Sequence, residues 1–239
     1  MTDRPILFSA PMVRALLQGR KTQTRRILHG VPDAPAMDAV HPANKIRHAA
    51  PYLDAYCGQP KTDSNPRGMG PRWCWWTRDD RPGPLFNVGY APGDRLWVRE
   101  GCMIADRSAG FDVTHNATGS TVGYLADGEG EWVDRAKVAG IRKRPGIHMP
   151  RWASRLTLAV TDVRVERLQD ISQTDAEGEG VRAVYGEPFD PASDITGRRM
   201  FELLWDHING VGAWEANPWV AAISFTVERR NIDAPQEAA

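Results

Sequence analysis

Two irregular stretches interrupt this sequence, so a regular core has to be built from the segments around them. Residues 29–92 are rich in Pro, Gly, Asp and Asn and keep no helical or strand period. Residues 101–146 are irregular as well, with strands expected at 121–125 and 131–133. A structureless loop of that length is unusual in a compact domain. We therefore expect one domain over residues 1–239, carrying two insertions with some local structure.

The segment before the first insertion shows strand and helix signals in turn. Residues 5–8 are apolar and indicate a short strand. Ser9 is a typical N-cap, Pro11 suits the first turn of a helix, and Gly19 suits its end. Residues 22–28 are rich in Thr, Arg and Ile, which favours a strand. The opening unit is predicted to be strand, short helix, glycine and strand.

Three further segments have the pattern of strands. Residues 93–99 follow a Pro-Gly turn and alternate in polarity, and residues 154–168 alternate over a length that indicates one long or bent strand. Residues 219–227 provide the closing strand. The order of these elements predicts an α+β fold with a mostly β core.

Two helices are expected in the last third of the chain. Ser172 with Asp175 three residues later resembles a capping box, which opens a short helix that stops at Gly180. A longer helix is expected from about Asp194 to the Asn209-Gly210 pair. Its apolar face consists of Phe201, Leu204, Trp205 and Ile208.

Composition excludes several classes of protein. The chain has no net charge at pH 7 and no apolar run of the length of a signal peptide or a membrane span. Its three cysteines include no C-x-x-C pair and match no zinc pattern, so we expect no metal and no other cofactor. A cytoplasmic location is the expectation. Residues 1–48 carry eight basic and three acidic side chains, which could form one anion-binding face.

The basic segment 19–26, Gly-Arg-Lys-Thr-Gln-Thr-Arg-Arg, places Lys21 and Thr24 directly after the expected helix. Side chains alternate along a strand, so these two can converge only if the chain turns or bulges after Gly19. A lysine whose pKa is lowered by neighbouring cations can take the proton of a threonine hydroxyl and activate it as a nucleophile. The competing interpretation is a solvated basic edge strand.

Glu179 stands at the expected C-terminal end of the helix that begins after Ser172. The helix macrodipole disfavours a carboxylate there by roughly 0.3–1 kcal/mol. Residues placed against a local preference are sometimes functional, so Glu179 is a candidate general acid. The alternative is an ordinary surface glutamate. His148 and the basic run 142–144 are weaker candidates, for a ligand and for a phosphate contact.

Several of these segments resemble the ASCH domain family, whose members are similar to PUA-like β-barrels. The chain looks like the longer ASCH proteins of bacteriophages and prophages. The resemblance implies a mixed β-barrel with short flanking helices, interrupted by the two insertions. The segments that carry it are Ile6-Leu7-Phe8, 19–26, Pro92-Gly93-Asp94-Arg95-Leu96-Trp97-Val98, Ile147-His148-Met149-Pro150-Arg151-Trp152-Ala153 and Asn217-Pro218-Trp219-Val220.

Within this family, the opening segment is similar to that of small bacterial amidohydrolases that remove acyl groups from N4-acetylcytidine. The resemblance places the proton acceptor at Lys21, the nucleophile at Thr24 and the proton donor at Glu179, within Ala176-Glu177-Gly178-Glu179. It implies hydrolysis of the amide of an N4-acylated cytosine nucleoside or base. This chain has Arg25 where those enzymes have an apolar residue.

Further residues are expected to hold the substrate. Arg26 could orient the carbonyl group or stabilise the oxyanion, and Trp97 or Trp219 could stack on the base. The expected partner is a small modified nucleoside or base, not a membrane. The candidate substrate-binding residues are Phe8, Ser9, Arg26, Trp97, Asn217 and Trp219.

Two other functions remain open at this point. A non-catalytic module that binds RNA or another nucleic acid would explain the basic N-terminal part, because PUA-like barrels often bind RNA. A ribonuclease would use Lys21 and Arg26 for phosphoryl chemistry, although no histidine pair supports it.

Overall fold

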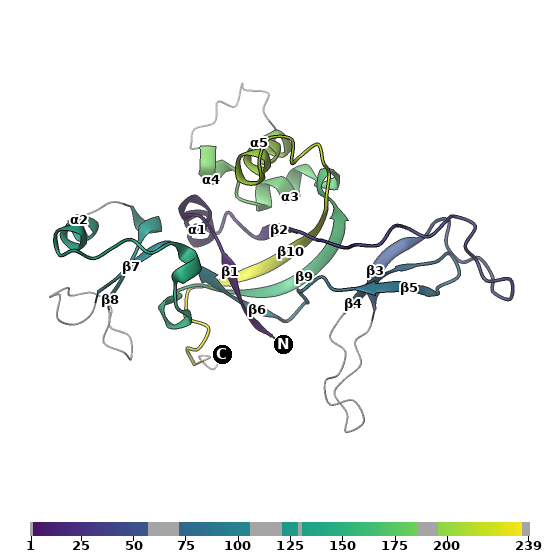
Figure 1. Ribbon diagram of the computed structural model, residues 1–239, viewed down its shortest axis with the longest axis horizontal. Helices are drawn as coiled ribbons and strands as arrows, with labels where there is room; N and C mark the ends of the chain where they lie inside the picture. The colour runs from purple at the N-terminus through teal and green to yellow at the C-terminus, as the bar shows by residue number, and fades with distance from the viewer. Residues whose placement is uncertain (1, 57–71, 106–120, 129–130, 186–195, 236–239) are drawn as a thin grey trace.

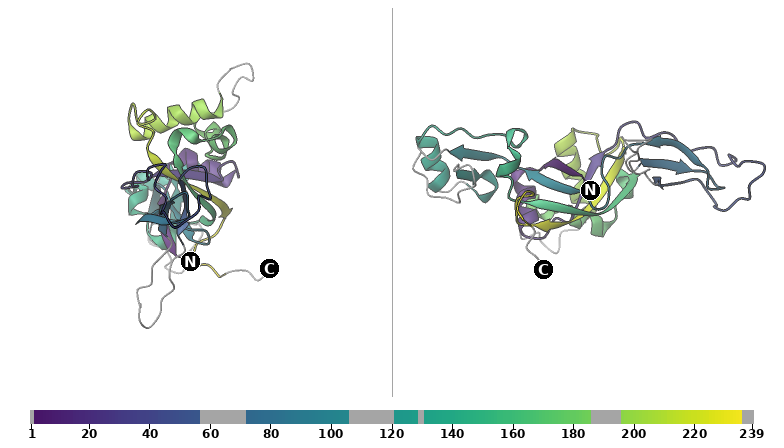
Figure 2. Two further views of the ribbon diagram at one scale, coloured as in Figure 1. Left: turned by 90° about the vertical axis from the view of Figure 1, so that its right-hand side faces the viewer. Right: turned by 90° about the horizontal axis from the view of Figure 1, so that it is seen from below.

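A computed structural model describes residues 2–56, 72–105, 121–128, 131–185 and 196–235 of the chain. Its centre is a five-stranded sheet with a group of helices on one side (Figure 1). Two smaller sheets lie at opposite ends of the central one, as the view from below in Figure 2 shows. The predicted α+β class is confirmed.

The central sheet combines one parallel pair with antiparallel neighbours. Its order is β1 (Asp3–Leu7), β6 (Arg95–Arg99), β9 (Thr157–Arg167), β10 (Trp219–Glu228) and β2 (Gln23–Ile27). β1 and β6 are parallel, and the other pairs are antiparallel. β9 and β10 form the longest pair, whose register shifts between Ser224 and Phe225. The long alternating pattern in the sequence therefore marked a central strand.

The sheet is open in the described part of the chain, so the predicted mixed β-barrel is not closed there. Among the described residues, β1 and β2 are its two edges and form no ladder with each other. Closing a sheet requires a continuous hydrogen-bonded register between its outer strands. Here a side chain bridges the edges instead, because Arg26 Nη2 on β2 donates to the backbone oxygen of Leu7 on β1 at 2.9 Å.

The helices begin and end close to the residues that their caps predict. The Ser172 hydroxyl accepts a hydrogen bond from the Asp175 N–H at 3.0 Å, which confirms that cap. The last helix is capped by Thr196, and Asp194, its expected start, lies outside the described residues. The helices on the sheet are α1 (Ala10–Leu17), α3 (Gln173–Gly178), α4 (Arg182–Tyr185) and α5 (Gly197–Asn209). Short 3-10 turns occupy Leu125–Asp127, Gly146–His148, Arg151–Ala153 and Leu168–Asp170.

The core lies between the sheet and the apolar faces of α1 and α5. Val13 and Leu16 of α1 are buried there with Phe201 and Trp205 of α5 and Ile223 of β10. Each large apolar side chain that becomes fully buried contributes about 1.5–3 kcal/mol relative to an exposed one. This packing fixes α1 and α5 against the sheet.

The first insertion contains a three-stranded antiparallel sheet. Its strands are β3 (Tyr52–Tyr56), β4 (Arg72–Trp76) and β5 (Pro82–Phe86). Trp73 packs against the main core, and the Trp75 ring lies 5.8 Å from the ring of Trp219 on β10. Two of its tryptophans thus hold this sheet to the rest of the chain.

The second insertion contains a hairpin and a helix, which are β7 (Cys102–Ala105), β8 (Thr121–Tyr124) and α2 (Glu131–Val138). The strand predicted at 131–133 is wrong, because these residues open α2. Short apolar runs do not distinguish a strand from a buried helical segment. Asp134 and Lys137 form an ion pair at 3.1 Å, a spacing of three residues that supports a helix. Among the described residues, no helix combines the length and apolar character of a membrane span.

Gly180 closes the connection from α3 to α4 at φ +78°, and a Cβ there would lie 3.0 Å from Ala15 Cβ and 3.1 Å from Lys21 Cβ. Gly180→Ala should combine backbone strain of about 1–2 kcal/mol with overpacking of about 1–3 kcal/mol. Gly30→Ala is the matched control, because its φ is +72° and no atom of the described residues lies within 4 Å of an added Cβ. Urea unfolding followed by tryptophan fluorescence should show the larger loss for Gly180→Ala; equal losses would contradict this packing.

Candidate active site

The chain after α1 delivers Lys21 to the interior. Gly19 has φ +71°, the left-handed conformation that ends many helices. The N–H groups of Arg20 and Lys21 both donate to the Ala15 carbonyl, at 2.9 and 3.2 Å, so the chain turns tightly before β2. Lys21 is 1% exposed although it belongs to a basic segment. The solvated-edge interpretation is therefore wrong for this lysine.

Glu179 meets Lys21 at the end of α3. The Thr22 N–H donates to the Gly178 carbonyl at 2.8 Å, which ties the start of β2 to this helix end. Lys21 Nζ donates to Glu179 Oε2 at 2.7 Å and to the Glu179 backbone oxygen at 2.8 Å. One cation thus offsets both the carboxylate and the negative helix end. Glu179 is 4% exposed, so it is not a surface glutamate.

Arg25 extends this contact into a buried network of charges. Its Nη1 donates to Glu179 Oε1 at 3.2 Å. Its Nη2 donates to Glu166 Oε1 at 2.7 Å and to Asp175 Oδ2 at 3.3 Å. Arg164 donates to Asp175 as well, at 2.9 Å. Buried charges are tolerated when they are paired, and these cations and carboxylates compensate one another.

Burial lowers the pKa of the Lys21 amine below its usual range, because water no longer solvates the ammonium. The charge and hydrogen bond of Glu179 oppose this shift, whereas the positive charges of Arg26 and Arg25 add to it. Lys21 therefore gives up its proton more easily than an exposed lysine does, as a general base requires.

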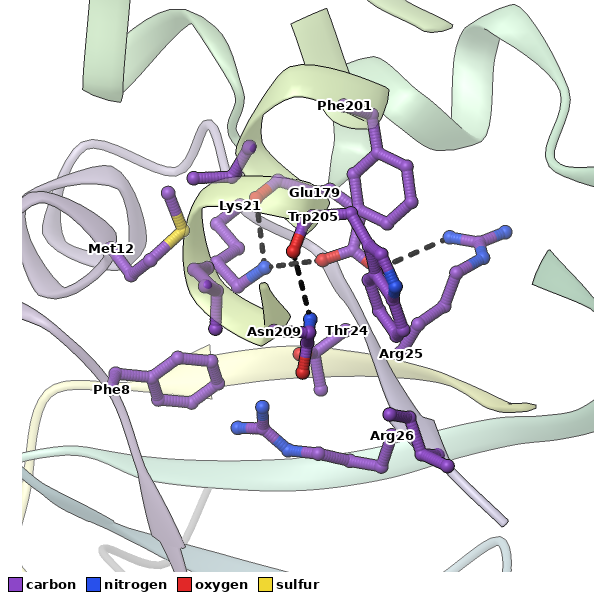
Figure 3. Close-up of a pocket in the computed structure, with 13 residues that line it drawn as sticks. Phe8, Met12, Lys21, Thr24, Arg25, Arg26, Glu179, Phe201, Trp205 and Asn209 are labelled. Carbon is purple, nitrogen blue, oxygen red and sulfur yellow. Dashed lines mark hydrogen bonds and ion pairs between the residues drawn. The ribbon is translucent and has the colours of Figure 1, made fainter. Parts of the chain in front are cut away.

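Lys21, Thr24 and Glu179 line one cavity of about 210 Å³ (Figure 3). The cavity lies at the open seam of the sheet, with Phe8 just beyond β1 and Thr24 on β2. Thr24 is 3% exposed, and its hydroxyl forms no hydrogen bond within the described part of the chain. The other residues of the wall are Met12, Arg25, Arg26, Ile27, Phe201, Leu204, Trp205, Ile208 and Asn209.

Three of the expected substrate-binding residues line this cavity or the groove next to it. Phe8 and Arg26 line the cavity, and the Arg26 guanidinium lies 5.2 Å from the centre of the Phe8 ring. Lys21 Nζ lies 5.5 Å from the same ring. Ser9 lines a neighbouring groove of about 700 Å³, to which Phe8 and Arg26 also contribute.

Trp97, Asn217 and Trp219, the other expected substrate-binding residues, line neither of these cavities. Trp97 is 9% exposed within β6. Asn217 has φ +41°, and its Oδ1 accepts a hydrogen bond from the Gln169 N–H at 2.9 Å. The Trp219 ring lies 4.3 Å from the guanidinium of Arg167. Asn217 and Trp219 therefore contact other parts of the protein, and Trp97 is covered within the sheet.

The sequence did not predict that α5 forms one wall of the cavity. Trp205 and Asn209 line the cavity, and Asn209 Nδ2 donates to the Trp205 carbonyl at 3.1 Å. The apolar face of α5 predicted core packing, which is correct for most of its residues. Asn209 before Gly210 was the available signal, and that pair also marks an ordinary helix end.

Neither a metal site nor a similar protein gives information on what this protein does. Among the described residues, no group of three His, Cys, Asp or Glu side chains could hold a metal ion. Comparison with protein-family models, curated proteins and solved structures found no match to this chain. The functional argument therefore depends on the chemistry of the cavity.

Arg25→Met should lower the free energy of unfolding by about 3–5 kcal/mol, because it leaves buried carboxylates without their shared cation. Arg164→Met is the matched control. The Arg164 side chain is 44% exposed and contacts Asp175 and Glu166, so its loss should cost at most about 1 kcal/mol. Urea unfolding at neutral pH measures both losses. Losses of equal size would contradict the central role of Arg25.

The stability of the network should also depend on pH. Burial alone would raise the pKa of Asp175, but hydrogen bonds from Arg164 and Gln23 and the charges of Arg164 and Arg25 lower it. A carboxyl whose pKa is lower in the folded protein adds stability above its unfolded value of about 3.9, and this is lost as pH falls through the folded value. Below about pH 4, wild-type stability should fall more steeply than that of Asp175→Asn in urea titrations. Parallel curves would refute this expectation.

Proposed function

We propose that this protein is an amidohydrolase that removes acyl groups from N4-acylated cytosine, as a nucleoside or a base. We further propose that its open sheet is a variant of the ASCH, PUA-like architecture. One observation carries the proposal: Glu179 at the end of α3 lines one cavity with Lys21 and Thr24, which come from a distant part of the chain. These are the three residue types that the resemblance to the small ASCH amidohydrolases requires at these positions.

The contact between Lys21 and Glu179 can prepare both catalytic groups in one step. In the ion pair, the ammonium cannot accept a proton and the carboxylate cannot donate one. Transfer of a proton along the 2.7 Å hydrogen bond from Nζ to Oε2 yields a neutral amine and a neutral carboxylic acid. Burial and the positive charges of Arg26 and Arg25 favour the neutral amine of Lys21, whereas the charge and hydrogen bond of Glu179 favour the ammonium. The site then holds a base and an acid together.

Acyl transfer would proceed from the neutral pair. The Lys21 amine takes the proton of the Thr24 hydroxyl while the Thr24 oxygen bonds to the amide carbonyl carbon. The carbon–nitrogen bond then breaks, and Glu179 protonates the leaving amino group of cytosine, which restores the ion pair. Water hydrolyses the acyl ester on Thr24 and releases the carboxylic acid.

The first proton transfer requires a small rearrangement. Lys21 Nζ donates to two acceptors of Glu179, and no hydrogen bond joins it to Thr24. Catalytic hydrogen bonds are often long in free enzymes and tighten when substrate binds. Before it can accept the Thr24 proton, the neutral Lys21 amine therefore has to turn its lone pair from the Glu179 carboxyl group toward the Thr24 hydroxyl.

Thr24→Ala and Glu179→Gln should each lower kcat by roughly 10³-fold or more, because each removes a group that acts in the transition state. Thr22→Ala and Glu177→Gln are matched controls, since both residues are exposed nearby in the chain. Loss of the acylcytosine absorbance with N4-acetylcytidine measures the rate. Wild-type protein that turns over no acylcytosine, or full activity in Thr24→Ala, would refute the proposal.

The variant Lys21→Arg tests whether Lys21 acts as a general base or only as a fixed positive charge. A guanidinium keeps the charge but does not lose its proton in proteins. If Lys21 is the base, the variant should be as inactive as Lys21→Ala over the whole pH range tested. If Lys21 only stabilises negative charge, Lys21→Arg should retain much of the activity lost in Lys21→Ala. Circular dichroism of both variants shows whether the fold is intact.

A further inference from the structure

The catalytic cavity continues into a larger groove. The groove has a volume of about 700 Å³, against about 210 Å³ for the cavity itself. Small-molecule sites are typically about 300–1,000 Å³, so the cavity alone suits only part of a nucleoside. The residues that line both spaces are Phe8, Met12, Arg26, Leu204 and Ile208. A ligand held at Thr24 would therefore extend past Arg26 into the groove.

The shape of an acylcytosine determines which of its parts reaches the groove, an argument that depends on the proposed function. The amide is attached at the N4 side of the ring, and the sugar is attached at N1, on the opposite side. When the amide carbonyl lies at Thr24, N1 and its substituent point away from Lys21 and Glu179. The groove is thus the space for the sugar and for whatever the sugar carries.

The lining of the groove is suited to an anion. Among its described residues there is no Asp or Glu, whereas Arg26 and His207 provide N–H donors and Ser9 and Tyr90 provide hydroxyls. The remaining lining residues are Pro5, Ile6, Leu7, Phe8, Pro11, Met12, Leu204 and Ile208. A neutral sugar alone does not require a cation at this position.

Arg26 differs from the other cations of the site. Lys21 and Arg25 are paired with Glu179, but Arg26 forms no ion pair with a carboxylate in the described part of the chain. Its side chain makes one hydrogen bond there, from Nη2 to the Leu7 backbone oxygen. The other guanidinium donors are available to a ligand, and arginine matches the geometry of phosphate oxygens.

We propose that the groove binds a phosphate group on the sugar, so the substrate is a phosphorylated nucleoside. The phosphate contacts Arg26, with His207 as a second donor on α5. The phosphate belongs either to a free nucleotide or to a phosphodiester next to the acylated base in a single strand. Both sources share the same chemistry and differ in what extends beyond the phosphate.

Binding tests this proposal without turnover. Calorimetry should give a Kd for cytidine 5′-monophosphate at least about tenfold lower than for cytidine, because a charge-assisted hydrogen bond to Arg26 is added. The preference should disappear in Arg26→Gln, shrink in His207→Gln and persist in Arg198→Gln. Arg198 lies on α5 and lines neither cavity, so it is the matched control.

Equal affinity for the two ligands, or no binding of either, would overturn the proposal, as would a preference that survives Arg26→Gln. Turnover is measured separately with N4-acetylcytidine, its 5′-monophosphate and a dinucleotide that contains the acylated base. A higher kcat/KM for the monophosphate supports a free nucleotide, and one for the dinucleotide supports a strand. If no acylcytosine is hydrolysed, the proposed reaction fails while the binding result still decides the phosphate site.

Discussion

The buried contact between Lys21 and Glu179 joins two parts of the chain that are 158 residues apart. Removing each charge from water costs several kcal/mol, so such a contact persists only when its remaining donors and acceptors are also satisfied. The structure meets this condition from both sides. Lys21 takes the backbone oxygen at the end of α3 as a second acceptor, and Arg25 donates to the other carboxylate oxygen. The position of α3 on the edge strand β2 depends on this arrangement.

The sheet makes room for the network through a small residue. Ala222 on β10 pairs with Arg25 on β2 and with Arg164 on β9, so the two arginines flank it in one row across three strands. An alanine at this place leaves the space above the row to the two guanidiniums and to the carboxylates that they contact. Within the described part of the chain, the sheet has no further strand at the outer side of β2. The cavity occupies that seam, where Arg26 rather than a backbone ladder reaches β1.

Local signals in the sequence predicted the helices and strands well. Features that depend on contacts between distant segments could not be predicted from them. Gly19 and the pair Ser172 and Asp175 act within a few residues, so their caps could be inferred directly. The row through Ala222 depends on the register of three strands, and no local pattern encodes that register. The open edge was missed for the same reason. The place of Asn209 in the cavity wall was not predicted. An Asn-Gly pair has the same local sequence whether it only ends a helix or also lines a cavity.

An ion pair that only supports the fold and one that takes part in catalysis can have the same N–O distance. The two roles therefore have to be distinguished by what surrounds the pair. A pair that only fastens a helix to a strand gains from close packing, because a void beside buried charges forfeits dispersion contacts without solvating them. Lys21 and Glu179 instead face a cavity of about 210 Å³, and the nearby Thr24 hydroxyl is not bonded within the described residues. Fastening α3 to β2 requires neither this cavity nor a hydroxyl that is left without a protein partner beside it. The combination of a cavity, a threonine hydroxyl without a hydrogen bond among the described residues and a lysine of lowered pKa favours a catalytic role over support alone.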